Sequence, residues 1–314
     1  MISDYVDEGY DKEDIEKEKI FLDDVEQALK RYGIKFTFFE FKTLDELDKE
    51  LQKYDRKKII IFNWAEEIYG KENSGALITE YLDKNSWIYS GAKTENLKLS
   101  LDRKLVNKIL RDNGIGVPNE YSLDDKNIIF PVIVKARYEH GSFGITKKSI
   151  LENKSDLDSY ISNVDSNKYI AEQFIHGIEY SISVWGNRNP TVLPIMDIKF
   201  DSRKDEKYKI MTYKSKWDKN DPDYKGVYSD IADNLDKSKK RRIEEECIKA
   251  FLVLKCNGIV RFEIREDDKD NLYFIDFNPN PNFAIDSAFM KSAREAGLSY
   301  GQVVLKLCEF ALEK

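Results

Sequence analysis

Charged side chains gather in residues 259–278, a pattern typical of two strands joined by a turn. Because side chains alternate between the faces of a strand, Arg261 and Glu263 share one face, and Asp276 and Asn278 share a face of the return strand. Like charges opposed across a hairpin are unfavourable. Mg²⁺ prefers one or two carboxylates plus ligand phosphates and would relieve that repulsion. The pattern predicts a magnesium site; the alternative is a solvated polar face on which Arg261 pairs with Glu263.

The same alternation predicts which side chains of the hairpin face the core. They are Val260, Phe262 and Ile264 on the first strand and Tyr273, Ile275 and Phe277 on the second. Residues 278–282, with the sequence Asn-Pro-Asn-Pro-Asn, then leave the sheet as a rigid, non-helical loop. Such a loop is suited to presenting side chains and backbone N–H groups to a ligand.

A glycine-bearing loop, Gly141-Ser142-Phe143-Gly144, follows six residues after Lys135, which ends a predicted strand. Backbone N–H groups in such a loop can contact phosphate oxygens. It is not a Walker A loop, because no Gly-Lys-Ser/Thr opens a helix, and it is not a Rossmann fingerprint. A flexible hairpin tip is the alternative. We interpret the two histidines, His140 and His176, as structural, and no Ser-His-Asp or Cys-His arrangement is indicated.

Alternating helices and strands are expected to position this chemistry. In the first ninety-odd residues, helices are predicted at 14–31, 44–54 and 75–84, and strands at 35–41, 58–63 and 87–89. This alternation predicts a parallel α/β sheet. One further helix is expected over residues 97–113.

The pattern changes after Pro118, where strands joined by short turns are predicted at 128–136, 169–175 and 179–185. Residues 201–236 form a polar stretch with little apolar periodicity, and a loop of that length is usually functional or mobile. A helix is predicted over 237–257. Its basic start, residues 239–242, precedes three glutamates, which indicates a solvated face with i,i+4 ion pairs.

Composition excludes several classes of protein. The 314 residues suggest about two domains. The net charge of −7 argues against a nucleic-acid partner, and no apolar run approaches the ~18 residues of a membrane helix. The acidic N-terminus lacks the features of a secretory signal. Cys247, Cys256 and Cys308 are too few and too scattered for a disulfide framework or a zinc site, which favours a cytoplasmic location.

Several weak motifs gain weight from their joint order and spacing. In chain order they lie at residues 61–67, 89–91, 101–103, 114–118, 134–135, 139–144, 172–175, 177–179, 213–218, 261–263, 276–279, 287 and 293–300. As a set, from about residue 14 to the C-terminus, the chain resembles the ATP-grasp superfamily and, within it, the D-alanine–D-alanine ligase branch.

The resemblance implies an α/β (α+β) ATP-grasp fold in three parts. A parallel α/β pre-ATP-grasp domain would occupy residues 1–97, with its first strand short or missing. A β-rich lid subdomain would occupy 98–178, and a C-terminal antiparallel-sheet domain 179–314. ATP would lie between the last two parts.

The resemblance also implies roles for individual residues. Contacts to ATP are expected from Arg103, where the family usually has lysine, and from Lys135, Gly141, Ser142, Gly144, Glu172, Gln173, Phe174, Ile175, Glu179 and Lys216. Within that set, 172–175 would form the adenine hinge, and Glu179 would bind the ribose hydroxyls. Catalytic roles would fall to Arg261, Lys216 and Ser142; two magnesium ions, with Mn²⁺ as an alternative, would bind Glu263, Asp276 and Asn278. Substrate contacts are expected from Asn282, Ser287 and Glu8.

The chemistry implied is carboxylate activation. One carboxylate attacks the γ-phosphate of ATP to give an acylphosphate, and an amine then forms the amide, with release of ADP and phosphate. Phosphoryl transfer depends on positioning and charge neutralisation, which fits a site rich in lysine, arginine and metal ligands. Amino acids or small peptides are the expected substrates, and a homodimer is expected by analogy.

Three departures from the family all touch the acyl-substrate site. The first strand is short, so that Glu8 is a poor match to the family's substrate-binding glutamate. Asn282 replaces the oxyanion-hole glycine, and Trp64-Ala65-Glu66 replaces a histidine-glycine pair. We therefore expect a carboxylate–amine ligase whose substrates need not be D-alanine. The alternatives are a true D-alanine–D-alanine ligase and a non-catalytic ATP-binding regulator or scaffold.

Overall fold

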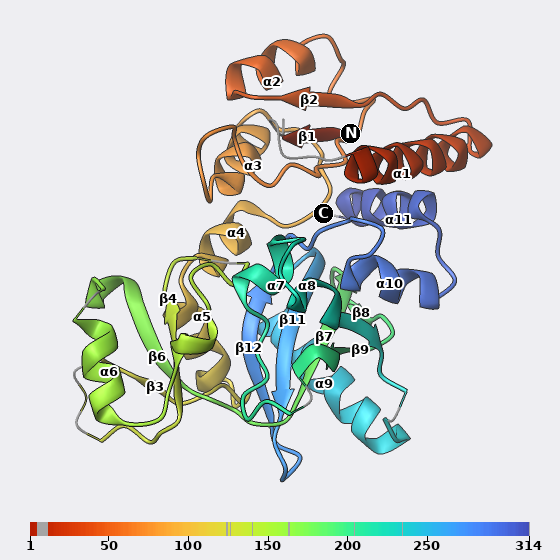
Figure 1. The fold of residues 1–314 in the computed structure, drawn as a ribbon. Coiled ribbons are helices and arrows are strands. Elements are labelled where there is room, and N and C mark those ends of the chain that lie inside the picture. The colour runs from red at the N-terminus through yellow and green to blue at the C-terminus, as the bar shows by residue number, and fades with distance from the viewer. Residues whose placement is uncertain are drawn as a thin grey trace.

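Three sheets and their covering helices make up the chain in a computed structural model (Figure 1). The structure describes residues 1–4, 12–123, 125, 127–139, 141–162, 164–203, 205–233 and 235–313. The predicted mixture of helices with parallel and antiparallel strands is confirmed.

The N-terminal region contains a small parallel sheet. β1 (Ile2–Asp4) pairs with β2 (Phe39–Phe41), so the first strand is present and three residues long. The segment predicted as a strand over 58–63 lies in parallel between β1 and the segment at Tyr89, but only through bridges at Ile61 and Asn63. Its predicted central place is confirmed, and its regular pairing is shorter than expected.

The helices of the first 112 residues lie close to their predicted positions. They are α1 (Lys12–Arg31), α2 (Leu44–Leu51), α3 (Gly75–Lys84), α4 (Thr94–Ser100) and α5 (Arg103–Asp112). The single helix expected over 97–113 is wrong, because Asp102 divides it. The Asp102 carboxylate accepts hydrogen bonds from the backbone N–H groups of Lys104 and Leu105 and thereby caps α5.

The second sheet is antiparallel, in the order β3-β6-β4-β5. Its strands are β3 (Glu120–Tyr121), β4 (Val132–Ala136), β5 (Ile150–Leu151) and β6 (Tyr169–Gln173), with α6 (Lys154–Ile161) packed on one side. Short 3₁₀ turns, η1 (Lys147–Ser149) and η2 (Ser166–Lys168), complete the connections.

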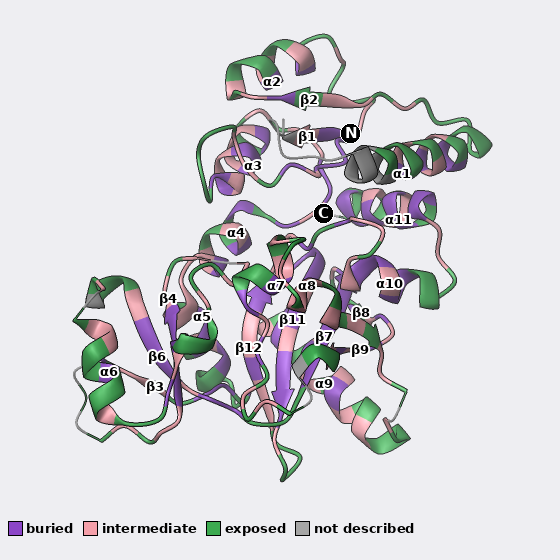
Figure 2. Ribbon diagram, viewed as in Figure 1, coloured by how far each residue is buried: buried purple, intermediate pink, exposed green. Residues whose placement is uncertain are grey.

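The third sheet has the order β10-β9-β7-β11-β12, with β8 paired to β7. Its strands are β7 (Ile178–Gly186), β8 (Thr191–Val192), β9 (Met196–Phe200), β10 (Val227–Ile231), β11 (Gly258–Glu266) and β12 (Leu272–Asn278). The helices around it are α7 (Tyr213–Trp217), α8 (Asp223–Gly226), α9 (Lys237–Val253), α10 (Ala288–Glu295) and α11 (Tyr300–Leu312). Strands β7 and β11 are buried along most of their length (Figure 2).

The first and last helices, α1 and α11, lie side by side (Figure 1). Gly301 allows this close approach, because a Cβ at that position would lie 1.9 Å from the Cβ of Ala28. The Gly301 N–H donates to Asp24 at 3.1 Å. One apolar cluster thus joins Val25 and Leu29 of α1 to α10 and α11.

The hairpin of β11 and β12 has the predicted charged face. Arg261 is paired in register with Asn278, and Glu263 with Asp276. The predicted core face of β12 is partly wrong, because a β-bulge follows the Glu263–Asp276 pair and shifts the alternation. Among the residues predicted to face the core, Phe277 is buried there, but Tyr273 and Ile275 are not.

The bulge places Phe274 in the core beside Phe262, with ring centroids 5.2 Å apart. Ile275 turns to the charged face instead. Because one extra residue reverses the side-chain alternation, a simple two-residue period could not predict this exchange.

The polar stretch 201–236 was predicted to lack regular structure, and this is also partly wrong. It contains η3 (Asp201–Arg203), α7, α8 and β10. β10 pairs with β9 along all five of its residues. Such pairing depends on a partner strand and not on local propensity, which explains why the sequence pattern was weak.

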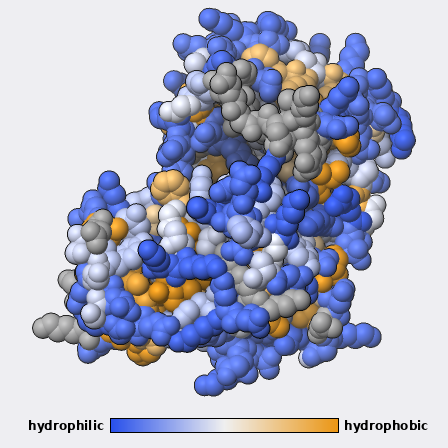
Figure 3. Space-filling model, viewed as in Figure 1, coloured by the Kyte–Doolittle hydropathy of each residue, from blue (hydrophilic) through white to orange (hydrophobic). Residues whose placement is uncertain are grey.

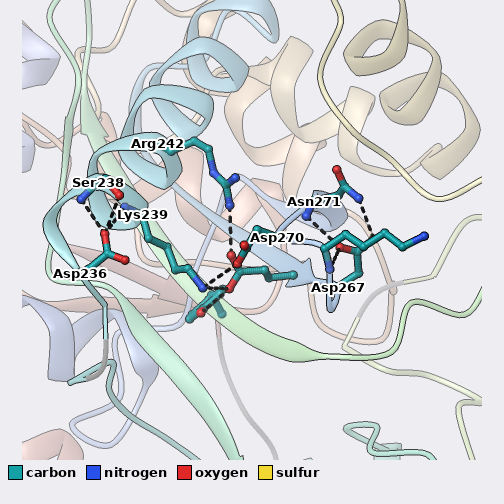
Figure 4. Close-up of polar contacts among 10 residues, drawn as sticks. Asp236, Ser238, Lys239, Arg242, Asp267, Asp270 and Asn271 are labelled. Atoms are coloured by element: carbon teal, nitrogen blue, oxygen red, sulfur yellow. Dashed lines mark hydrogen bonds and ion pairs between the residues drawn. The ribbon is translucent and has the colours of Figure 1, made fainter.

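Ion pairs anchor the far end of the β11–β12 hairpin to α9 (Figure 4). Glu266, 3% exposed, accepts from Lys239 at 3.2 Å, Arg242 at 3.1 Å and the Tyr180 hydroxyl at 2.9 Å. Lys239 also pairs with Asp270 in the turn. Two residues of the basic run 239–242 therefore anchor the hairpin to α9.

The other two basic residues of that run form the predicted i,i+4 pairs. Arg241 lies 2.7 Å from Glu245 and Lys240 lies 3.9 Å from Glu244. The surface in this view is largely hydrophilic (Figure 3). No helix in the described part of the chain is long and apolar enough to cross a membrane.

Candidate functional site

A narrow cavity of about 80 Å³ lies between the second and third sheets. Its walls come from both sheets, from the glycine-bearing loop and from the segment before α7. The lining residues are Arg103, Pro118, Ile133, Lys135, Ser142, Ile145, Glu172, Gln173, Phe174, Ile175, Glu179, Ile210, Met211, Lys216, Glu263, Arg265, Ile275 and Asp276.

A wider cleft of about 590 Å³ adjoins this cavity and shares Lys216, Glu263 and Asp276 with it. It extends from the charged hairpin face toward the N-terminal region and α10. Among its other lining residues are Glu66, Glu67, Gly141, Ser181, Trp217, Tyr228, Arg261, Asn278, Asn282, Asp286, Ser287 and Lys291.

The two cavities bring together nearly all the residues singled out in the sequence. Gly144 lines neither of them and lies at a separate hollow beside Phe143 and Tyr213. Glu8 and His140 fall outside the residues that the structure describes. His176 is exposed and packs against the rings of Phe174 and Tyr208, consistent with a structural role.

The narrow cavity contains a buried ion pair between adjacent strands. Lys135 on β4 lies 2.7 Å from Glu172 on β6, and their side chains are 9% and 3% exposed. The second oxygen of Glu172 accepts from the Asn107 amide at 3.0 Å. Because a lysine ammonium has three donors, Lys135 retains capacity for a ligand oxygen.

Two further ion pairs lie where the cavity meets the cleft. Arg103, at the first position of α5, donates to Asp276 at 2.5 Å and to the Glu139 carbonyl oxygen at 2.8 Å. On the hairpin, Arg261 donates to Glu263 at 2.8 Å. The Arg261–Glu263 pair of the alternative interpretation is therefore present, but it lines a cleft and is not a solvated face.

Glu263 has a buried carboxylate oxygen, Oε2, that lacks a hydrogen-bond partner among the described residues. Burial raises the pKa of Glu263, and Arg261 and Lys216 oppose this shift. An unsatisfied carboxylate oxygen facing Asp276 and Asn278 fits a bound cation.

Lys216 extends from α7 into the junction of the two cavities. Burial lowers the pKa of Lys216, while the nearby Glu263 carboxylate acts in the opposite direction. No hydrogen bond or ion pair joins its ammonium group to another described residue. A buried ammonium group without such a partner is suited to bind an anionic ligand.

The glycine-bearing loop adopts the left-handed conformation at Gly141, Ser142 and Gly144, with φ of 64°, 63° and 68°. Ser142 is a non-glycine residue in this region, a form of strain that is concentrated at functional loops. The loop is joined to α7 by the Trp217 indole, which donates to the Gly141 carbonyl oxygen at 3.0 Å. Phe143 also packs edge-on against Tyr213.

The substrate residues expected near α10 line the wider cleft. Ser287 caps α10, and its oxygen accepts from the Met290 N–H, so its hydroxyl proton is still available to a ligand. Asn282 does not adopt a left-handed φ. Its backbone therefore does not require the glycine that the family has there.

Sequence reasoning missed Arg265, Trp217 and Asn107, which all make contacts in the site. Arg265 could have been found, because the two-residue alternation that pairs Arg261 with Glu263 continues to Arg265 on the same face of β11. Trp217 and Asn107 act through contacts between distant segments, for which the sequence carries no local signal.

No group of three or more His, Cys, Asp or Glu side chains in the described ranges could hold a metal ion by itself. The predicted set has two carboxylates and one amide. This is consistent with Mg²⁺, which takes one or two carboxylates and completes its shell with phosphates and water.

Comparison with known proteins identifies relatives of this chain. The family described as "D-ala D-ala ligase C-terminus" matches residues 119–309. A D-alanine–D-alanine ligase from Natranaerobius thermophilus is 28% identical over 269 residues, covering 79% of this chain and 69% of the relative. One from Carboxydothermus hydrogenoformans is 26% identical over 285 residues, covering 85% and 86%.

Solved structures share the fold. A Bacillus anthracis D-alanine–D-alanine ligase complexed with ATP is 19% identical, with a TM-score of 0.72 over 99% of this chain and 95% of that chain. The VanG D-Ala:D-Ser ligase from Enterococcus faecalis is 18% identical, with a TM-score of 0.67 over 99% and 98%.

The fold and the relatives define an ATP-grasp ligase, an ATP-dependent enzyme that joins a carboxylate to an amine. The family profile covers more than half of the chain. The chain therefore belongs to the D-alanine–D-alanine ligase C-terminus family, and the predicted superfamily, branch and fold class are confirmed.

Proposed function

We propose that this ligase activates the carboxylate of an amino acid or small peptide. A carboxylate oxygen bonds to the γ-phosphorus of ATP as the bond to the β,γ-bridging oxygen breaks, and ADP leaves. The amine nitrogen then bonds to the carbonyl carbon of the acylphosphate, phosphate leaves, and the amine loses a proton. The products are an amide, ADP and phosphate.

One observation carries this proposal. In a chain of net charge −7, four cations, Arg103, Lys135, Lys216 and Arg261, meet in two adjoining cavities. Carboxylates line the same cavities and pair with three of these cations, whereas the Lys216 ammonium has no such partner among the described residues. Phosphoryl transfer is accelerated mainly by positioning and by stabilising charge on the transferred group, so this arrangement suits the reaction.

The narrow cavity is proposed to bind ATP. Residues 172–175 would contact the adenine edge, Glu179 the ribose hydroxyls, and Lys135 and Arg103 the phosphates. The loop 141–144 would close over the phosphates, with the left-handed Ser142 in contact with them. Lys216, at the junction of the two cavities, would reach the transferred phosphate.

Magnesium is proposed to bind Glu263, Asp276 and Asn278, as one or two ions. The buried, unpartnered Oε2 of Glu263 supports this. When bound, the metal would neutralise charge on the phosphates. Asp276 would at the same time hold Arg103, which it already contacts.

The wider cleft is proposed to hold the acid and the amine. Arg261 would stabilise negative charge at the acyl centre, with the backbone N–H of Asn282, and Ser287 would bind a substrate carboxylate at the N-terminus of α10. Because Glu66 and Asn282, at positions that depart from the family, line this cleft, the substrates need not be D-alanine. Domain boundaries after residues 97 and 178, a homodimer and a cytoplasmic location remain predictions.

A second candidate is a true D-alanine–D-alanine ligase, which the names of the relatives favour. Incubation with Mg²⁺, ATP and D-alanine, followed by mass spectrometry of the dipeptide, distinguishes the two. The broader test measures ADP release over L- and D-amino acids, β-amino acids and dipeptides. Turnover with some substrate other than D-alanine supports the proposal. Nucleotide binding without turnover across the whole panel supports the non-catalytic alternative and contradicts it.

A further inference from the structure

Arg265 is the buried cation of the nucleotide cavity that no expected role uses. It lies on β11, is 5% exposed and lines the narrow cavity. It is paired in register with Glu179 of β7, so the two side chains project from adjacent strands on the same face of the sheet. Solvent cannot balance the charge of Arg265 at this depth, so the surrounding protein groups must do so.

Those contacts join three separate segments around the cavity. Arg265 donates from Nε and Nη2 to Glu179 at 2.9 and 2.6 Å, and from Nη1 to the Ile175 carbonyl oxygen at 2.8 Å. Nη2 also donates to the carbonyl oxygen of Lys209, directly before two residues that line the cavity, Ile210 and Met211. The guanidinium thus links β7, the hinge and the segment that leads to Lys216.

The guanidinium also lies 4.9 Å from the centre of the Phe174 ring, which is a cation–π contact. A lysine could not reproduce this set of contacts, because a planar guanidinium supplies several donors in fixed directions. Both bonds to Glu179 end on the same oxygen, Oε2. The other oxygen, Oε1, accepts no hydrogen bond from any described residue.

We propose that Arg265 is a positioning residue for ribose recognition. By fixing Oε2 of Glu179, it orients the carboxylate and leaves Oε1 to accept the ribose hydroxyls. The site would thereby prefer a ribonucleoside triphosphate to its 2′-deoxy form. This inference rests on the proposed binding of ATP in the narrow cavity with its ribose at Glu179.

The test is a comparison of binding affinities for ATP and 2′-deoxyATP. Isothermal titration calorimetry with Mg²⁺ and without acid or amine substrates avoids turnover. A hydrogen bond to a charged acceptor predicts that the wild-type protein binds ATP about tenfold more tightly than 2′-deoxyATP. Arg265→Met should weaken ATP binding and bring this ratio close to one, and Arg265→Lys should give an intermediate ratio.

Two further variants separate positioning from general loss of structure. Glu179→Gln keeps the shape of the side chain and should lose the same discrimination. The double variant should lose no more than either single one, since the two residues act as a unit. Arg242→Met is the matched control, because Arg242 pairs with Glu266 outside both cavities and should leave the ratio unchanged.

The outcomes are distinguishable. If Arg265→Met or, should that variant not fold, Arg265→Lys weakens both nucleotides equally, Arg265 is only structural and the inference is wrong. A wild-type ratio near one likewise refutes it, although ATP binding would still stand. If the wild-type protein binds no ATP, the proposed function fails instead.

Discussion

The narrow cavity, proposed to bind ATP, and the wider cleft, proposed to hold the other substrates, differ in how their polar groups are satisfied. In the narrow cavity, Lys135, Glu172, Glu179 and Arg265 are at most 8% exposed, and each is held by an ion pair. The wider cleft is lined by exposed residues, among them Glu66, Tyr228, Asn282 and Asp286.

Because of this difference, the polar side chains of the narrow cavity are fixed in direction, whereas those of the wider cleft can adjust. Buried ion pairs hold donors and acceptors in set directions, which suits a ligand of constant shape such as ATP. An open cleft with exposed side chains imposes fewer constraints, so its residues can differ between related enzymes without disturbing the nucleotide side. Glu66 and Asn282, which belong to two of the departures from the family, line this second region.

The largest effect is expected where the two regions share a residue. Asp276→Asn keeps the shape of a residue that lines both cavities but removes the charge that would bind Mg²⁺ and pair with Arg103. We expect kcat for ADP release to fall about 10³-fold. Asp268→Asn, an exposed acid in the turn of the same hairpin, is the control and should be unchanged. Equal activity of the two variants would contradict the metal assignment.

The next effect concerns Lys216, also shared by both cavities. Lys216→Gln removes a cation that no described residue neutralises by direct contact, and we expect kcat to fall about 10²-fold with a smaller change in KM for ATP. Lys214→Gln, on the same helix but exposed, tests for loss of α7 itself. A change in KM alone would place Lys216 in ground-state binding and not at the transferred phosphate.

A smaller effect is expected at the contact that closes the glycine-bearing loop. Trp217→Phe keeps an aromatic ring but loses the N–H that donates to Gly141. One neutral hydrogen bond corresponds to about a 2- to 10-fold rise in KM for ATP. Steady-state kinetics at varied ATP concentration provide the measurement, and an unchanged KM would mean that this contact does not influence nucleotide binding.

The smallest effect is expected in the substrate cleft. Asn282→Gly restores the residue that the family has, but the Asn282 backbone is not left-handed, so kcat should change by less than about threefold. The added freedom of the unfolded chain should lower stability by about 0.5–1 kcal/mol, seen as a lower Tm. A large gain in kcat would show that the Asn282 side chain obstructs the reaction.

Local patterns predicted the positions of α1, α3 and the charged hairpin, because amphipathic periodicity and strand alternation are properties of neighbouring residues. They failed where distant segments decide the structure. The bulge that turns Phe274 inward depends on the register of β11, and β10 depends on β9.

The same distinction applies to the site. The residue types on the hairpin alone predicted a cation site, and no contact with another segment was needed for that prediction. In contrast, the Lys135–Glu172 and Arg265–Glu179 pairs each join two strands, and the Trp217 contact joins α7 to the glycine-bearing loop. Only the folded chain shows that these cations, which could each have been surface charges, are largely satisfied by specific partners.

The packing of α1 on α11 has a consequence for the order in which the protein is made. The apolar face of α1, with Val25 and Leu29, is covered by a helix near the other end of the chain. At the usual pace of a ribosome, tens of seconds separate the synthesis of the two helices. During that interval this face lacks its final cover, so the nascent chain should be a client for chaperones until α11 has emerged.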